Sequence, residues 1–247
     1  MDSPAPLAAN AGLAYLGEAA WAPAILSGRQ AEQLSTAVNP CGRPNSDVLR
    51  RRLAVVDGSP SESWQIDFPD HFTNQEAALY ERPFARLQAQ APGGRWLNPH
   101  AQPALRRALA RVSRFLASPA QASVPDWSWI EEDLLPDATL LVVARDDDFA
   151  HGVLGSALFA VWWHAHLSLC APVQRVESFP FPWPPATTLS ALTAGQESHR
   201  HAIARASRSG KAEQLNAAVL AAYGWPAPIP DNIQLENLAE LNCRRAG

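Results

Sequence analysis

The 247-residue sequence is poor in lysine and cysteine and contains no long hydrophobic run. Lys211 is its single lysine, and its three cysteines, Cys41, Cys170 and Cys243, lie far apart. This spacing predicts neither a disulfide framework nor a zinc site, which needs paired thiols. No apolar stretch approaches the roughly 20 residues that span a bilayer, and the N-terminus lacks the basic region of a secretory signal. We therefore expect a cytoplasmic bacterial protein with no membrane partner, whose hydrophobic fraction of 47% supports a folded core.

Sequence motifs of two enzyme classes are also missing. A methyltransferase needs a glycine-rich loop for S-adenosylmethionine, and enzymes that methylate amino groups of DNA add an Asn/Asp-Pro-Pro-Tyr/Phe tetrapeptide. The nearest strings, at 39–42, 98–101 and 152–155, fall short of both. A nuclease of the PD-(D/E)xK type needs a lysine two residues after an acid, but Ser209 stands two residues before Lys211. We therefore expect no catalytic residue and no cofactor site in this chain.

Histidines and acids suggest a metal site by type but not by spacing. His164 and His166 lie two residues apart in an expected helix, as do His199 and His201. Residues at that interval point to different faces of a helix, so one helix cannot offer both to one ion. The acidic run at 146–148 is interpreted as a helix cap and a solvated turn. No bound metal is expected.

Charge is unevenly distributed along the chain. The net charge of −4 argues mildly against nucleic-acid binding. However, seven arginines and no acid lie within 82–114, and a second acid-free stretch covers 199–211. Acids gather at 131–133 and 146–148 instead. Such segregation produces a local positive face despite an acidic total. A solvated arginine face without function stays open as the alternative.

The segment 103–118 has the pattern of an amphipathic helix. Pro103 suits the first turn of a helix. The apolar residues fall at helical spacing: Leu105, Leu109, Val112 and Leu116. Three arginines at intervals of four and three are expected to share another face: Arg107, Arg111 and Arg114. This helix would offer one side to a core and one to anions.

Other segments carry simpler signals. Short strands joined by turns are expected within 37–102, at 52–57 and 63–68. A buried strand from 138 ends in the acidic run, and a helix over 149–168 follows, capped by Asp148. The proline-rich stretch 170–185 is expected to be extended. From about 188 the pattern is helical, with stops at Gly210 and Gly224 and a start at Asp231.

These elements predict an α+β architecture. A mixed strand–helix domain is expected over 1–187, in which 1–36 forms a linker-like lead-in. A small helical region is expected over 188–247. Five tryptophans are interpreted as core residues rather than as platforms for bases: Trp64, Trp162, Trp163, Trp183 and Trp225.

Five motifs in order resemble one family. The first motif consists of two segments, 38–51 and 63–87. The second segment contains a Trp-x-Ile-Asp-Phe element and a Tyr-x-x-Pro-Phe helix. The residues that match these are Trp64, Ile66, Asp67, Phe68, Tyr80, Pro83 and Phe84. The other four motifs lie at 95–118, 146–162, 178–185 and 217–246. Together they resemble the target-recognition and C-terminal region of MmeI-like and related adenine-specific DNA methyltransferases of restriction–modification type.

The resemblance implies a DNA target-recognition domain that holds the duplex and reads its bases. A separate catalytic domain, absent here, would bind S-adenosylmethionine and methylate adenine. Arginines meet phosphates to set register, whereas a few side chains reach base edges. The expected phosphate contacts are Arg95, Arg106, Arg107, Arg111 and Arg114. The expected base readers, whose chemistry suits adenine, guanine and cytosine respectively, are Gln174, Arg175 and Glu177.

The expected function is therefore that of a DNA-binding specificity module. Its partners would be double-stranded DNA and a methyltransferase catalytic domain or subunit. Two alternatives stay open at this point. One is an interaction module that docks on a separate methyltransferase subunit without binding DNA, which the acidic net charge favours slightly. The other is an independent hydrolase whose residues meet only in the folded chain.

Overall fold

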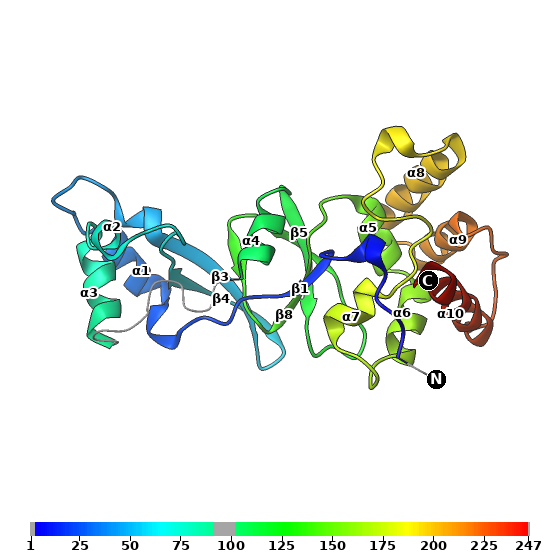
Figure 1. Ribbon diagram of the computed structural model, residues 1–247, viewed down its shortest axis with the longest axis horizontal. Coiled ribbons are helices and arrows are strands. Elements are labelled where there is room, and N and C mark those ends of the chain that lie inside the picture. The colour runs from blue at the N-terminus through cyan, green and yellow to red at the C-terminus, as the bar shows by residue number, and fades with distance from the viewer. Residues whose placement is uncertain (1–2, 91–101, 247) are drawn as a thin grey trace. The chain divides into compact units, whose positions relative to one another are not determined.

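The structure is a computed structural model that describes residues 3–90 and 102–246. Arg95 lies outside the described residues. Two compact units make up the chain, and each is built from separate segments. The first unit contains Met1–Tyr15, Ala108–Ile130 and Leu141–Gly247. The second unit contains Leu16–Arg107 and Glu131–Leu140. Helices and strands are mixed in sequence order, which confirms the expected α+β fold class (Figure 1).

A four-stranded sheet forms the centre of the second unit. Its strands, in the order β2-β4-β3-β7, are β2 (Ile25–Leu26), β4 (Ser59–Ile66), β3 (Leu49–Val56) and β7 (Leu134–Pro136). β3 and β4 form an antiparallel hairpin, and β7 pairs in parallel with β3. Asp57 and Gly58 both have positive φ values, as the two-residue turn of a tight hairpin requires. The expected strands at 52–57 and 63–68 are confirmed as the two arms of this hairpin.

Short helices lie between the strands of this sheet along the chain. They are α1 (Gly28–Ser35), α2 (Asn74–Ala77), α3 (Glu81–Gln90) and α4 (Pro103–Leu109), with 3-10 turns at Ala22–Ala24 and Asn45–Val48. Capping boxes begin two of them, at Ser27 for α1 and at Thr73 for α2. α1, α2 and α3 contribute Ala31, Ala77 and Leu87 to one core cluster, which also contains Leu26, Leu49, Ile66, Phe68 and Tyr80.

The first unit contains most of the second sheet. Three terminal strand residues, Leu16, Glu131 and Leu140, belong to segments of the second unit. In the order β1-β8-β5-β6, they are β1 (Ala14–Leu16), β8 (Leu140–Val143), β5 (Arg114–Pro119) and β6 (Ser128–Glu131). Every residue of β8 is buried, which fits its central position and its run of leucine and valine. The buried strand expected before the acidic run is thereby confirmed.

Helices make up most of the rest of the first unit (Figure 1). They are α5 (Asp148–Leu154), α6 (Ala157–Ala165), α7 (Pro172–Glu177), α8 (Ala194–Ser209), α9 (Ala212–Ala222) and α10 (Asp231–Ala246), with 3-10 turns at Ala8–Asn10 and Leu189–Ala191. α8 contacts α5 and α9, and α10 contacts α6. The left-handed conformation of Gly210 ends α8, and α10 begins at Asp231, so these expected helix limits are confirmed.

Aromatic residues dominate the core of the first unit. Trp162 and Trp163 are fully buried, and Trp183 joins the same cluster, against which Trp225 packs partly buried. Trp64 packs in the same way on the core of the second unit. The interpretation of all five tryptophans as core residues is confirmed.

The expected helix over 103–118 is wrong in its second half. α4 ends at Leu109, and the chain then turns and enters β5 at Arg114. The four residues 115–118 are all buried between β8 and β6. A short, continuous apolar run of this kind satisfies a helical period and a buried strand equally well. Strand pairing decided the outcome, so Arg107, Arg111 and Arg114 do not share a helix face.

Two further expectations need correction. The helix over 149–168 is divided, because α5 ends at Gly155 and the hydroxyl of Ser156 begins α6 by accepting from the Phe159 amide. The N-cap of α5 is Asp147 rather than Asp148. The stretch 170–185 is not extended throughout, since Pro172 opens the helix α7.

The expected domain boundary near residue 187 stays a prediction. The helices beyond it pack against the same aromatic cluster as α5 and α6, because Ile203, Val219 and Leu238 all belong to that cluster. Within the part of the chain that the structure describes, no helix is both long and apolar enough to cross a membrane.

Candidate nucleic-acid interface

Arg106, on α4, is engaged by two carboxylates of its own unit. Its guanidinium donates to Glu18 at 2.7 and 2.6 Å and to Asp67 at 2.9 and 2.8 Å. Burial lowers the pKa of Arg106, but the hydrogen bonds and charges of Glu18 and Asp67 raise it well above its ordinary value. All three of its nitrogens are therefore occupied within the fold.

Glu18 is itself fixed in place. Its carboxylate also accepts from the backbone amide of Gln102 at 2.9 Å, and its backbone carbonyl accepts from the buried Arg52. Arg52 forms a further ion pair with Asp137. These groups hold the segment around Glu18 against the sheet of the second unit. Arg106 and Arg52 thus stabilise the fold, because both form ion pairs with acidic residues of the second unit.

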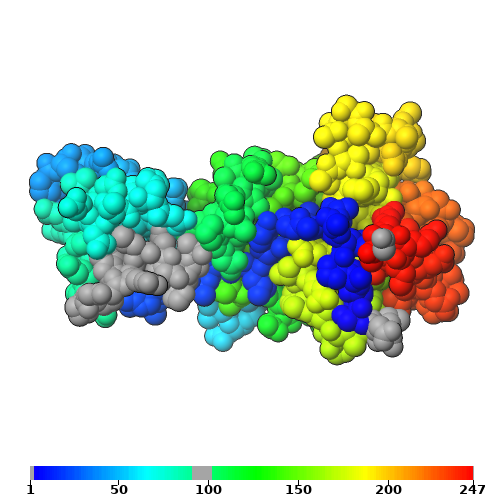
Figure 2. Space-filling model, in the orientation of Figure 1, coloured from blue at the N-terminus to red at the C-terminus, as the bar shows by residue number. Residues whose placement is uncertain are grey.

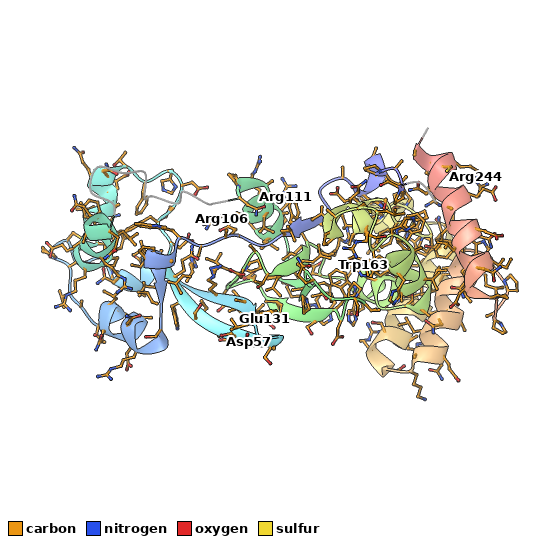
Figure 3. All side chains as sticks on the ribbon, turned by 90° about the horizontal axis from the view of Figure 1, so that it is seen from below. Asp57, Arg106, Arg111, Glu131, Trp163 and Arg244 are labelled. Atoms are coloured by element: carbon orange, nitrogen blue, oxygen red, sulfur yellow. The ribbon has the colours of Figure 1, made fainter. Side chains whose placement is uncertain are left out.

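Arg107 and Arg111 have a different environment. Arg107 is exposed and makes one hydrogen bond, from Nε to the Pro103 carbonyl at 3.1 Å. Arg111 lies exposed in the turn after α4 (Figure 3). It has no ion pair with any residue that the structure describes. Each guanidinium is open to an external anion.

Arg114, at the start of β5, is half-buried against an aromatic ring. Its guanidinium carbon lies 3.7 Å from the centroid of Trp129, in a cation–π contact. One nitrogen pairs with Asp148 at 2.9 Å, and two donate to the Asp146 carbonyl at 3.3 Å. Arg114 is held in one orientation by these contacts.

The acidic run at 146–148 is largely neutralised. Asp147 caps α5 and pairs with Arg145 at 2.6 Å. Asp148 pairs with both Arg114 and Arg208. The run therefore repels an approaching polyanion less than its sequence suggests.

The three expected base readers lie on α7 and each has contacts within the first unit. Arg175 is buried, with its guanidinium carbon 3.8 Å from the Trp163 ring centroid, and burial lowers its pKa. Its Nε and Nη1 have no hydrogen-bond partner among the described residues. Glu177 accepts from the Gly12 amide at 2.9 Å, and Gln174 donates weakly to Ser3 and Pro4. Base reading by these residues stays a prediction. All three side chains are held by contacts within the first unit.

A further set of basic side chains lies on α8 and was not assigned from the sequence. His201, Arg205 and Arg208 are exposed along one side of the helix, and the exposed Lys211 follows its end. Figure 2 shows α8, in yellow, projecting from the surface of its unit. The sequence indicates this set by the acid-free stretch 199–211. Its basic residues are three and four positions apart, so they lie on one side of a helix.

In the described ranges 3–90 and 102–246, no group of three or more histidines, cysteines or acids could hold a metal ion. His164 is exposed, whereas His166 is buried and bonds to the Trp162 carbonyl at 2.8 Å. The expectation that these two histidines point apart is confirmed.

Comparisons with known proteins identify one fold relationship. No family model matches the chain, and no curated protein sequence matches it. Among solved structures, the chain is similar to the Type IIL restriction-modification enzyme MmeI in complex with DNA, with a TM-score of 0.57 and 12% sequence identity. The similarity covers 99% of this chain and 36% of that chain. The chain thus has the fold of a part of a Type IIL restriction-modification enzyme and spans about a third of that enzyme's length.

Proposed function

We propose that this chain is a DNA-binding module of a restriction–modification system. In its more specific form, the module supplies sequence specificity to an adenine-specific DNA methyltransferase. The observation that carries the proposal is the similarity of fold, over 99% of the chain, to an enzyme solved in complex with DNA. The ordered motifs from 38 to 246, which resemble methyltransferases of this type, support the same reading.

Surface electrostatics agree with a duplex as partner. Arg107 on the second unit is exposed and has no ion pair with a described residue. The same holds for Arg111, Arg205 and Lys211 on the first unit. Cations that neutralise phosphates release condensed counterions, and this release gives affinity without reading sequence. Arg106 and Arg114 are less suitable, because carboxylates engage them and only 23% and 36% of their side chains are exposed.

The proposal assigns the chemistry of methylation to another domain or subunit. S-adenosylmethionine would bind there, and this chain would hold the duplex in register for it. The glycine-rich loop and the Asn/Asp-Pro-Pro-Tyr/Phe tetrapeptide are both missing from the 247 residues. Calorimetric titration with S-adenosylmethionine should therefore give no saturable binding to the chain alone.

The test is a salt titration of duplex binding by the full chain. Fluorescence anisotropy of a labelled duplex should show that log K falls linearly with log salt between about 50 mM and 200 mM. Arg111→Ala should make that slope shallower by about one unit. Arg29→Ala removes an equally exposed arginine from α1, in the second unit, and serves as a control for net charge. It should change the slope less than Arg111→Ala does.

Two results would count against the proposal. Absence of duplex binding at low salt would favour the interaction module, which docks on a methyltransferase subunit without touching DNA. Saturable micromolar binding of S-adenosylmethionine would instead place the cofactor site in this chain.

A further inference from the structure

The helix α8 is fixed at both ends and on one side. Thr193 begins it with a capping box, and Gly210 ends it in the left-handed conformation. Its inner side buries Ile203, Ala204 and Ala206. Gly152 on α5 permits the close approach, because a Cβ there would lie 2.6 Å from the Ile203 Cγ2 atom. The outer side of α8 therefore has a defined direction relative to the core of its unit.

The outer side presents basic residues at regular intervals. His201, Arg205 and Arg208 follow each other at intervals of four and three, and Lys211 comes one residue after the Gly210 cap. From His201 to Arg208 the helix rises by about 10 Å. The other exposed residues on this side are small: Ser198, Ala202 and Ser209. We call this surface, formed by His201, Arg205, Arg208 and Lys211, the α8 basic face.

Most of this charge is not compensated. Glu197 pairs with His201 at 2.9 Å and with Arg200. Arg208 shares Asp148 with Arg114, so one carboxylate serves two guanidiniums. Arg205 and Lys211 have no ion pair with a described residue. The α8 basic face thus keeps a net positive charge at neutral pH.

Arg208 is positioned in advance for an anion. Asp148 holds one of its nitrogens, yet 62% of the Arg208 side chain remains exposed. Arg205 lies one turn earlier on the same side. Two guanidiniums with free N–H groups at that spacing can share one phosphate or contact two neighbouring ones. Because Asp148 already orders Arg208, less side-chain entropy is lost when a phosphate binds.

The chemistry of the face selects among polyanionic partners. No large apolar side chain lies among its exposed residues, whereas a membrane-binding helix needs apolar anchors and a protein interface needs aromatic or aliphatic ones. A sugar–phosphate backbone needs neither, since exposed cations alone provide its contacts. We propose that the α8 basic face is a contact surface for the phosphate backbone of duplex DNA. This inference rests on the proposed function and adds a surface separate from Arg107 and Arg111.

The test compares reversals of charge in the same unit. The double variant Arg205→Glu, Lys211→Glu should bind a labelled duplex more weakly than wild type and with a salt slope shallower by about two units. Arg244→Glu on α10 is the control, because Arg244 is equally exposed in the first unit but lies outside the α8 basic face. Its salt slope should match that of wild type.

A variant with the opposite effect sharpens the test. Asp148→Asn removes the carboxylate that holds Arg114 and Arg208, so the local positive charge rises. The added positive charge should outweigh the lost ordering of Arg208, so this variant should bind the duplex more tightly, with a slope steeper by up to about one unit. Thermal unfolding of every variant confirms that it is folded before binding is compared.

The outcomes separate this inference from the proposed function. If wild type binds duplex DNA and the double variant binds equally well, the inference fails while the function stands. A loss for Arg244→Glu of about half that of the double variant, whose charge change is twice as large, would attribute the effect to total charge and would also overturn it. If wild type does not bind duplex DNA at all, the function fails and the inference with it. If the double variant loses binding to phosphatidylserine vesicles while its DNA binding stays intact, the α8 basic face contacts a membrane surface instead.

Discussion

Arg106 Nε donates to Glu18 Oε1 at 2.7 Å, while its Nη2 donates to Glu18 Oε2 at 2.6 Å. This two-point contact joins residues 88 positions apart in the sequence. Asp67 meets the same guanidinium from the end of β4. One arginine therefore ties α4, the hairpin and the segment after β1 together in the second unit.

Removal of Arg106 should be strongly destabilising. Arg106→Ala leaves Glu18 and Asp67 buried, at 6% and 7% side-chain exposure, without their shared cation. Breaking a buried ion pair from one side costs about 3–5 kcal/mol. Urea unfolding measures the loss. Arg107→Ala, at an exposed neighbouring position, should stay within about 0.5 kcal/mol of wild type. Equal effects of the two substitutions would show that the pairs add nothing to stability.

Gly152 should tolerate no side chain. A Cβ there would lie 2.6 Å from Ile203 Cγ2 and 3.2 Å from both Leu215 Cδ1 and Ser207 Cβ. Gly152→Ala should therefore separate α5 from α8 and destabilise the protein by about 1–3 kcal/mol. Gly28→Ala is the control, because nothing lies within 4 Å of its added Cβ. Thermal unfolding should place the control at or above wild type, and a Gly152→Ala protein of wild-type stability would refute the packing argument.

Arg175 offers the reverse case, a buried cation whose removal should be tolerated. Its Nε and Nη1 have no hydrogen-bond partner among the described residues, and its guanidinium packs on Trp163. Arg175→Met keeps a similar length and a favourable sulfur contact with the ring. Replacing a buried charge by an apolar side chain is often neutral or stabilising by about 1–4 kcal/mol. The variant should also bind a non-specific duplex as wild type does. A selective loss on a cognate site would support the prediction that Arg175 reads a base.

His166 should make stability depend on pH. Burial lowers its pKa from the ordinary 6.5, so the unfolded chain binds this proton more readily than the folded one. The stabilising effect is complete above the unfolded value and is lost as pH falls through the folded value. Wild type should thus lose more stability than His166→Gln between about pH 7.5 and pH 5.5. His164→Gln, on the exposed side of α6, should retain the wild-type profile in denaturant unfolding at both pH values. Identical profiles for all three proteins would rule the mechanism out.

Local signals predicted much of the fold. The two strands of the hairpin could be predicted, although Asp57 belongs to the turn and not to the first strand. The end of α8 at Gly210 and the start of α10 at Asp231 could also be predicted. β5 could not be recognised, since residues 115–118 fit a helix and a buried strand alike, and only β8 and β6 decide between them. The roles of the arginines depended on partners that are distant in sequence. Nothing near Arg106 indicates that Glu18 will meet it, whereas the α8 basic face follows directly once the helix register is known.

The chain passes between its two units after residues 15, 107, 130 and 140. Neither unit is thus a continuous stretch, and no single proteolytic cut can release one of them whole. The sheet of the second unit is completed by β7, which joins β3 only after some 80 further residues have been made. Contacts of such long sequence separation slow folding, because the loop must close before the contact forms. During synthesis, the hairpin unit has to wait for its last strand while the first unit is still without α5 to α10.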